Sequence, residues 1–125
     1  MSVDESSAPE SREITFVNRF SLRTTPAEFE RAFTRTSEFM GRQPGFLRHT
    51  LLRHMDREDS YLNIAYWRDV ESFRKAVTHP DFPPHAAALR AVCTSEPGLY
   101  APRSTSTGSA HEHDGGARRT DAGQR

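Results

Sequence analysis

The sequence predicts an α+β fold in which helices cover one face of an antiparallel sheet. Two observations predict it. Short segments of alternating apolar and polar residues are interspersed with segments whose apolar residues recur at helical spacing. These segments follow one another in the order βαββααβ, which is typical of an α+β sandwich.

The aromatic residues mark the folded part of the chain. All twelve fall between residues 16 and 100 of the 125, and a chain of this length suits one domain. We therefore expect one folded domain over residues 13–102. Residues 1–12 and 103–125 carry too little apolar surface to offset the entropy of ordering, so we expect a disordered N-terminal arm and a disordered tail.

A strand and then a helix are expected first. Residues 13–22 alternate in the pattern of a strand, and one face carries Ile14, Phe16, Phe20 and Leu22. A hydroxyl at Thr25, a proline in the first turn and Glu28 three residues after the cap predict the start of a helix. Apolar residues then recur at helical spacing until Gly41 ends the helix.

Two more strands follow, at residues 46–55 and 61–67, joined by a polar hairpin turn at residues 56–59. Pro97-Gly98 is expected to form a turn before a short last strand at residues 99–101.

Two helices lie between these strands and the last one. Asp69 caps a short helix that ends at His79-Pro80, and Pro83 starts a second helix that runs to Val92. The complete order predicts a ferredoxin-like α+β sandwich, in which the first and third strands are neighbours.

The composition argues against several classes of function. The 17 basic and 17 acidic residues give a net charge of zero, whereas proteins that bind nucleic acid or anionic membranes usually carry a clear positive excess. No apolar run approaches the roughly 18 residues of a membrane span. The single cysteine, Cys93, indicates a reducing compartment. We expect a cytoplasmic protein with neither nucleic acid nor membrane as a partner.

Motifs for cofactors are also missing from the sequence. It has no His-Glu-x-x-His, no Cys-x-x-Cys and no histidine pair four residues apart, so it predicts no metal site. His111 and His113 could bind a metal only weakly, and they lie in the expected disordered tail. The sequence also lacks the glycine-rich loop of a nucleotide site and the Gly-x-Ser-x-Gly of a hydrolase.

Two residues break the apolar pattern of the strands. Asn18 shares a face with Phe16 and Phe20, and Asn63 shares a face with Trp67, the only tryptophan. A primary amide among apolar side chains costs a few kcal/mol unless it is hydrogen-bonded. Because the first and third strands are expected to be neighbours, one pocket could hold Asn18, Asn63 and Trp67. The alternative is structural: a buried asparagine can satisfy a bulge or a sheet edge, and a tryptophan can simply pack.

Several segments together resemble a known family. Phe16-Val17-Asn18-Arg19-Phe20, Gln43-Pro44-Gly45-Phe46 and Asn63-Ile64-Ala65-Tyr66-Trp67-Arg68-Asp69 resemble an antibiotic biosynthesis monooxygenase (ABM) domain over residues 13–102. The paired asparagines make the chain similar to the cofactor-independent anthrone oxygenases of anthracycline-type, nogalamycin-like polyketide pathways.

The resemblance implies a homodimer that forms a dimeric α+β barrel, with one substrate pocket per subunit. It implies that Asn18, Asn63 and Trp67 are catalytic, and that a polyketide anthrone is oxidised to the quinone by O₂ with no cofactor. The two amides and the indole N–H would stabilise negative charge on the substrate. His49, His54 or His85 could assist proton removal. The expected substrate-binding residues are Phe16, Phe29, Phe33, Phe39, Tyr61, Tyr66, Phe82, His49 and His85.

Three other functions remain open. A haem-degrading oxygenase shares the fold, and His85 falls near its haem ligand, but Lys75-Ala76-Val77 stands where that branch carries a further aromatic residue. A dimer of the same fold could bind a ligand without catalysis. An RNA-binding module of ferredoxin-like fold would need aromatic motifs and a basic surface that this sequence lacks.

Overall fold

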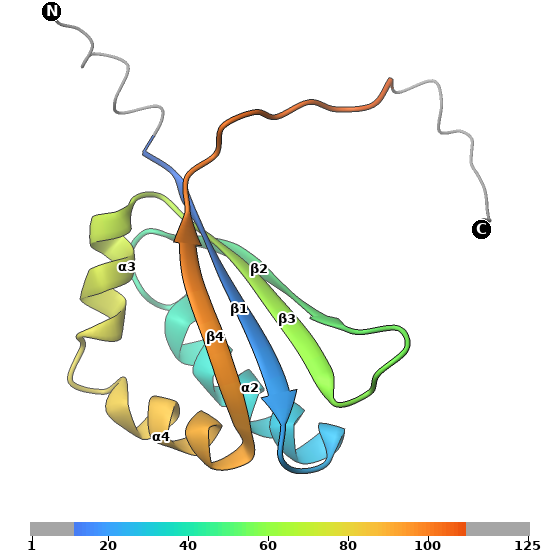
Figure 1. The fold of residues 1–125 in the computed structure, drawn as a ribbon. Coiled ribbons are helices and arrows are strands. Elements are labelled where there is room, and N and C mark those ends of the chain that lie inside the picture. Colours follow the sequence, from blue (N-terminus) through green and yellow to red (C-terminus); the bar gives the residue numbers. More distant parts are fainter. Residues whose placement is uncertain (1–11, 110–125) are drawn as a thin grey trace, which may run out of the picture.

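The structure is a computed structural model that describes residues 12–109. The elements are β1 (Ile14–Leu22), α2 (Pro26–Gly41), β2 (Phe46–Arg53), β3 (Ser60–Trp67), α3 (Val70–Val77), α4 (Pro83–Val92) and β4 (Cys93–Tyr100) (Figure 1). Residues 101–109 are exposed and form no helix or strand. The remainder of the two expected disordered segments, with His111 and His113, lies outside the described residues. The bounds of the folded domain therefore stay a prediction.

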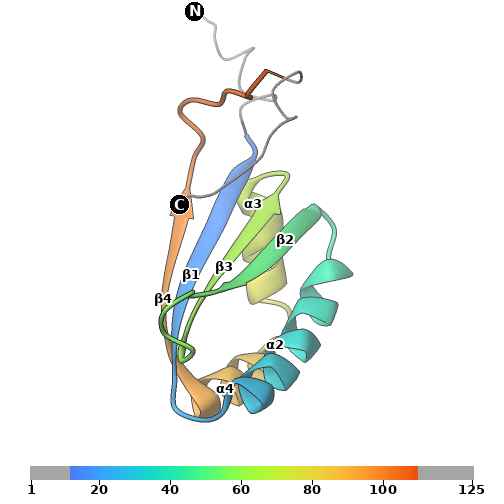
Figure 2. The ribbon, with the colours of Figure 1, turned by 90° about the vertical axis from the view of Figure 1, so that its right-hand side faces the viewer.

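The four strands form one antiparallel sheet in the order β2-β3-β1-β4. The predicted α+β, ferredoxin-like fold is confirmed, as is the pairing of the first and third strands. The helices lie on one side of this sheet, to the right of β1 and β4 in Figure 2. Over residues 12–109 the opposite face of the sheet has no helix against it, and we call it the outer face.

Local sequence accounts for the helix boundaries. Thr25 caps α2 by accepting a hydrogen bond at Oγ1 from the Glu28 backbone N–H at 3.2 Å, and Pro26 opens the first turn. Asp69 caps α3 in the same way, with its Oδ1 2.8 Å from the Ser72 N. That backbone hydrogen bond is the main reason why the pKa of Asp69 is lowered.

The last strand differs from the prediction. β4 begins directly after α4 at Cys93, so Pro97 and Gly98 lie within the strand and do not form a turn. β4 is an edge strand that pairs only with β1. An edge strand needs ladder hydrogen bonds along one side only, which allows it to contain a proline.

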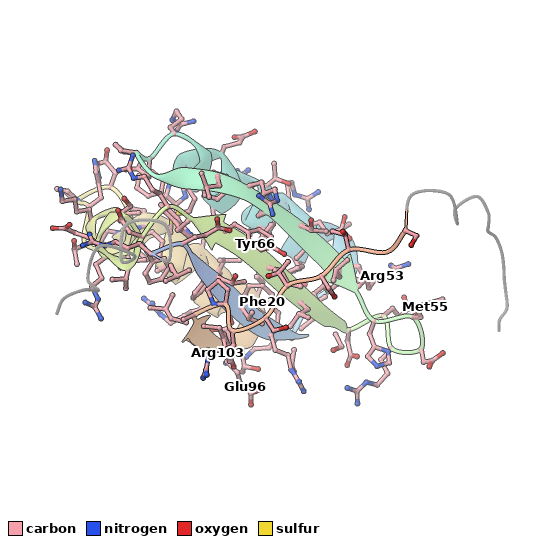
Figure 3. All side chains as sticks on the ribbon, turned by 90° about the horizontal axis from the view of Figure 1, so that it is seen from above. Phe20, Arg53, Met55, Tyr66, Glu96 and Arg103 are labelled. Carbon is pink, nitrogen blue, oxygen red and sulfur yellow. The ribbon has the colours of Figure 1, made fainter. Side chains whose placement is uncertain are left out.

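The β2–β3 hairpin also begins earlier than the sequence predicts. β2 ends at Arg53, and Met55 lies in the connection with 97% of its surface exposed (Figure 3). The His54 ring turns the chain here, because its Nδ1 accepts a hydrogen bond from the Asp56 backbone N at 3.0 Å.

A β-bulge changes which face β2 presents to the helices. Phe46 pairs with Trp67, but Arg48 pairs with the next residue, Tyr66, so Leu47 is the extra residue. Phe46 and His49 consequently share the inner face of the sheet although an odd number of positions separates them. Simple alternation would have put them on opposite faces.

The core consists of two apolar clusters at opposite ends of the inner face. One holds Phe20, Phe29, Phe33, Tyr61 and Cys93, and the other holds Ala65, Trp67, Phe73 and Ala76. The register places Asn18 and Asn63 between them, since Phe20 pairs with Tyr61 on one side and Phe16 with Ala65 on the other. A polar pair thus separates the two halves of the core. Within residues 12–109, no helix is both long and apolar enough to cross a membrane.

Candidate active site

A cavity of about 100 Å³ lies between the inner face of the sheet and the helices. The strands contribute Phe16, Asn18, Phe20, Phe46, His49, Asn63, Ala65 and Trp67. The helices and the start of α4 contribute Phe33, Thr36, Ser37, Met40, Phe73, Val77, Phe82 and Leu89. The lining is therefore mostly apolar and aromatic, with a few polar groups from the strands and from α2, as is typical of a small-molecule site.

The two asparagines lie side by side in this wall. Asn18 and Asn63 are direct partners in the β1–β3 ladder, and directly opposite residues of an antiparallel pair project from the same face. Asn63 is buried, with 8% of its surface exposed. Oδ1 of Asn18 is buried and has no hydrogen-bond partner. An unpartnered buried oxygen costs about 1–3 kcal/mol, which is more readily explained by a ligand than by packing.

Trp67 also lines the cavity. It is 1% exposed, and its ring packs edge-on against Phe46 and Phe73 at centroid distances of 5.2 and 5.7 Å. The structure thus places Asn18, Asn63 and Trp67 in one cavity, as the sequence predicts.

Four of the expected substrate-binding residues also line the cavity. They are Phe16, Phe33, Phe82 and His49. His49 is the single titratable side chain in the lining, and its Nδ1 lies 3.3 Å from Oδ1 of Asn63. The Phe33 ring packs against the imidazole at a centroid distance of 5.6 Å.

The other five expected residues do not line this cavity, so a role for them in binding substrate stays a prediction. Phe29 and Tyr61 belong to the core cluster that contains Phe20, where the Tyr61 hydroxyl donates to Glu30 at 2.5 Å. Burial and this carboxylate raise the pKa of Tyr61. Phe39 lies behind the lining, and His85 packs on its ring at 5.2 Å.

Tyr66 points away from the cavity altogether. It precedes Trp67, so alternation places it on the outer face. There the Arg48 guanidinium lies 4.0 Å from the centre of its ring.

Neither of the other histidines considered for proton removal is part of the lining. His54 lies in the exposed hairpin, and His85 lies against Phe39. Cys93, whose pKa is raised by burial, belongs to the core cluster that contains Phe20. Among residues 12–109, no group of three or more His, Cys, Asp or Glu could hold a metal ion.

The sequence analysis missed several lining residues. α2 contributes Thr36, Ser37 and Met40, which follow Phe33 by three, four and seven residues. That spacing marks one face of a helix and could have identified them. Phe46 was hidden by the bulge at Leu47, which the sequence does not reveal.

Comparison with known proteins agrees with this architecture. The chain is 55% identical over 105 residues to deoxynogalonate monooxygenase of Streptomyces nogalater, covering 79% of this chain and 89% of that protein. The crystal structure of SnoaB, a cofactor-independent oxygenase from the same organism, matches with a TM-score of 0.74 and 57% identity, covering 75% of this chain and 96% of that one.

More distant structures share the fold alone. A conserved protein from Methanosarcina mazei Go1 matches with a TM-score of 0.67 at 14% identity, over 76% of this chain and 97% of that one. The antibiotic biosynthesis monooxygenase family matches residues 14–98, nearly the whole of the described fold. The resemblance inferred from the sequence is confirmed, and the chain belongs to the antibiotic biosynthesis monooxygenase family.

Proposed function

We propose that this protein is a cofactor-independent monooxygenase that oxidises a polyketide anthrone, a 12-deoxy anthracycline precursor, to the quinone with O₂. The observation that carries the proposal is the pair of amides, Asn18 and Asn63, side by side in an aromatic cavity that Trp67 also lines. The names of the relatives, a deoxynogalonate monooxygenase and a cofactor-independent oxygenase, support the same activity.

The chemistry needs charge stabilisation more than it needs a cofactor. An anthrone CH₂ lies between two aryl rings and is conjugated to a carbonyl, so loss of a proton gives an electron-rich enolate. The enolate transfers one electron to O₂, and the radical pair combines to form a C–O bond. The resulting peroxide loses water, so one oxygen atom enters the quinone and the other leaves as water.

The cavity suits the enolate intermediate. Negative charge grows on the carbonyl oxygen, and fixed neutral donors in a site that excludes water stabilise such charge by about 2.7–4 kcal/mol each. Amide N–H groups of Asn18 and Asn63 and the indole N–H of Trp67 are donors of this kind. The ring walls of Phe16, Phe33 and Phe82 fit a flat polycycle.

The proposal includes a homodimer formed through the outer face of the sheet. This face carries apolar side chains, among them Val17, Leu62 and Ile64, which no helix of the described chain covers. A second copy seated there would bury them and complete a dimeric α+β barrel. The single cysteine supports a cytoplasmic location, where thiols stay reduced.

Turnover by protein freed of cofactors tests the function. Protein dialysed against chelator, with no flavin or haem added, is incubated with a hydroxylated anthrone while O₂ uptake and quinone absorbance are recorded. We expect one O₂ consumed per quinone formed. A requirement for added iron, flavin or haem would reject the proposal and favour another oxygenase of the family.

Asn63→Ala distinguishes an enzyme from a ligand-binding dimer. We expect kcat to fall by about 10²–10³, the loss typical of one donor to a developing anion, with little change in anaerobic affinity for the anthrone. Affinity is measured by quenching of the fluorescence of Trp67, the only tryptophan. A variant that loses affinity while the wild type shows no turnover would indicate a binding protein.

A further inference from the structure

The side chain of His49 reaches Asn63 across neighbouring strands. His49 pairs with Ala65 in the β2–β3 ladder, so Asn63 is its diagonal neighbour on the same face, a separation that a long side chain spans. Nδ1 of His49 lies 3.3 Å from Oδ1 of Asn63, at the long end of hydrogen-bond distances. Because an amide oxygen only accepts, Nδ1 carries the proton in this contact.

Such a contact gives a primary amide a defined orientation. The oxygen and nitrogen ends have nearly the same shape, so a half-turn of the side chain exchanges an acceptor for a donor. With Oδ1 of Asn63 held by His49, Nδ2 is left to donate to a ligand in the cavity. The imidazole is itself confined, because the rings of Phe33 and Phe46 lie 5.6 and 6.1 Å from it.

The other asparagine has no such support. Oδ1 of Asn18 is buried without a hydrogen-bond partner, although Asn18 is the direct ladder partner of Asn63. The protein therefore orients one amide of the pair and leaves the oxygen of the other free. A hydrogen bond to its oxygen also polarises an amide and makes its N–H groups stronger donors.

We propose that His49 is a positioning residue for the reaction: by donating from Nδ1 to Oδ1 of Asn63, it holds the Nδ2 amide group toward the substrate oxygen that gains negative charge. This inference rests on the proposed oxygenase function. It assigns the histidine a role through Asn63 and not as the base that removes the proton. The bulge at Leu47 acquires a function, since it is what brings His49 to the inner face.

Two substitutions of His49 separate these roles. His49→Phe keeps an aromatic ring and loses the donor, so we expect kcat to fall about tenfold with KM almost unchanged, because the oriented amide acts mainly on the transition state. His49→Gln keeps an N–H donor but no base, and we expect it to recover most of the loss. Equal losses in both variants would overturn the positioning role in favour of a base.

A double-mutant cycle tests whether His49 acts through Asn63. In the Asn63→Ala background we expect His49→Phe to change kcat by less than about twofold, because its partner is gone. In the Asn18→Ala background we expect the full effect of about tenfold, since the side chain of His49 contacts the oxygen of Asn63, whereas the oxygen of Asn18 has no hydrogen-bond partner. An undiminished effect in the Asn63→Ala background would overturn the proposal.

His54→Phe is the matched control, because His54 comes directly after β2 but lies exposed in the hairpin. We expect this variant to keep the wild-type kcat.

A readout independent of turnover is the side-chain amide NMR signal of Asn63, assigned by its loss in Asn63→Ala. We expect it to shift in His49→Phe and to stay in place in His54→Phe. An unmoved signal overturns the positioning role, whereas wild-type protein without turnover rejects only the oxygenase function.

Discussion

In the proposed function, Asn18 and Asn63 favour activity at the expense of stability. Both lie between two apolar clusters, where an apolar side chain would bury no unpaired polar group. His49 contacts the oxygen of Asn63, but the oxygen of Asn18 is unpartnered in the free protein. Unsatisfied buried polar groups are typical of active sites, because a group that binds a ligand has no partner when the ligand is absent.

Asn18→Val makes this trade-off measurable. Removing the unpartnered oxygen should increase the free energy of unfolding by about 1–2 kcal/mol, because valine suits a strand interior. The same variant should lose most of its anthrone-oxidising activity. Urea denaturation and steady-state kinetics measure the two effects. A variant that is both less stable and fully active would show that Asn18 serves packing.

At the scale of single residues, the sequence predicted that Asn18, Asn63 and Trp67 could share a pocket, but not that His49 contacts Asn63. Asn18 and Asn63 stand out because they interrupt an alternating apolar pattern. The contact from His49 could not be predicted, because it depends on the extra residue at Leu47. Tyr66 was expected to bind substrate, whereas alternation along β3 places it on the outer face, opposite to Trp67.

Among the elements, α2 is specified most fully by local sequence. Its cap at Thr25, its proline at the first turn and its buried stripe all agree with the observed bounds. Consistency of this kind explains why the helix was predicted to the residue. β4 was predicted poorly because proline is usually evidence against a strand, and only the topology shows that this strand lies at an edge.

Thr25→Ala tests the contribution of the cap. The Glu28 N–H would lose its hydrogen bond to the hydroxyl, and we expect the free energy of unfolding to fall by about 1 kcal/mol. Thr25→Ser, which keeps the hydroxyl, should stay within about 0.5 kcal/mol of wild type. Both are measured by urea denaturation. Equal losses in the two variants would show that the methyl group, not the cap, matters.

At the scale of the whole molecule, the outer face of the sheet is the surface that we propose to bind a partner, because no helix of the described chain covers it. The described domain is small, and a small domain buries a limited part of its surface when it folds alone. Helices protect the cavity side of the sheet, whereas Leu62 and Ile64 on the outer face have no cover of this kind. We propose that a second copy of the chain covers this face.

Ile64→Lys tests the dimer. A lysine at the centre of the outer face would place a charge in the proposed interface, and we expect the mass in solution to fall from that of two chains to that of one. Light scattering coupled to size exclusion measures it. Glu96→Lys, on the same face but in the edge strand β4, should leave the mass unchanged. A monomeric wild type would contradict the interface.

The origin of the oxygen atom tests the central claim most directly. Metal-free, flavin-free protein is given a hydroxylated anthrone under ¹⁸O₂ in ordinary water, and the quinone is examined by mass spectrometry before carbonyl exchange proceeds. The amide-lined cavity predicts a quinone heavier by one ¹⁸O atom, formed by the wild type and about 10²–10³ times more slowly by Asn63→Ala. Unlabelled quinone, or labelled quinone formed equally fast by the variant, would contradict the account.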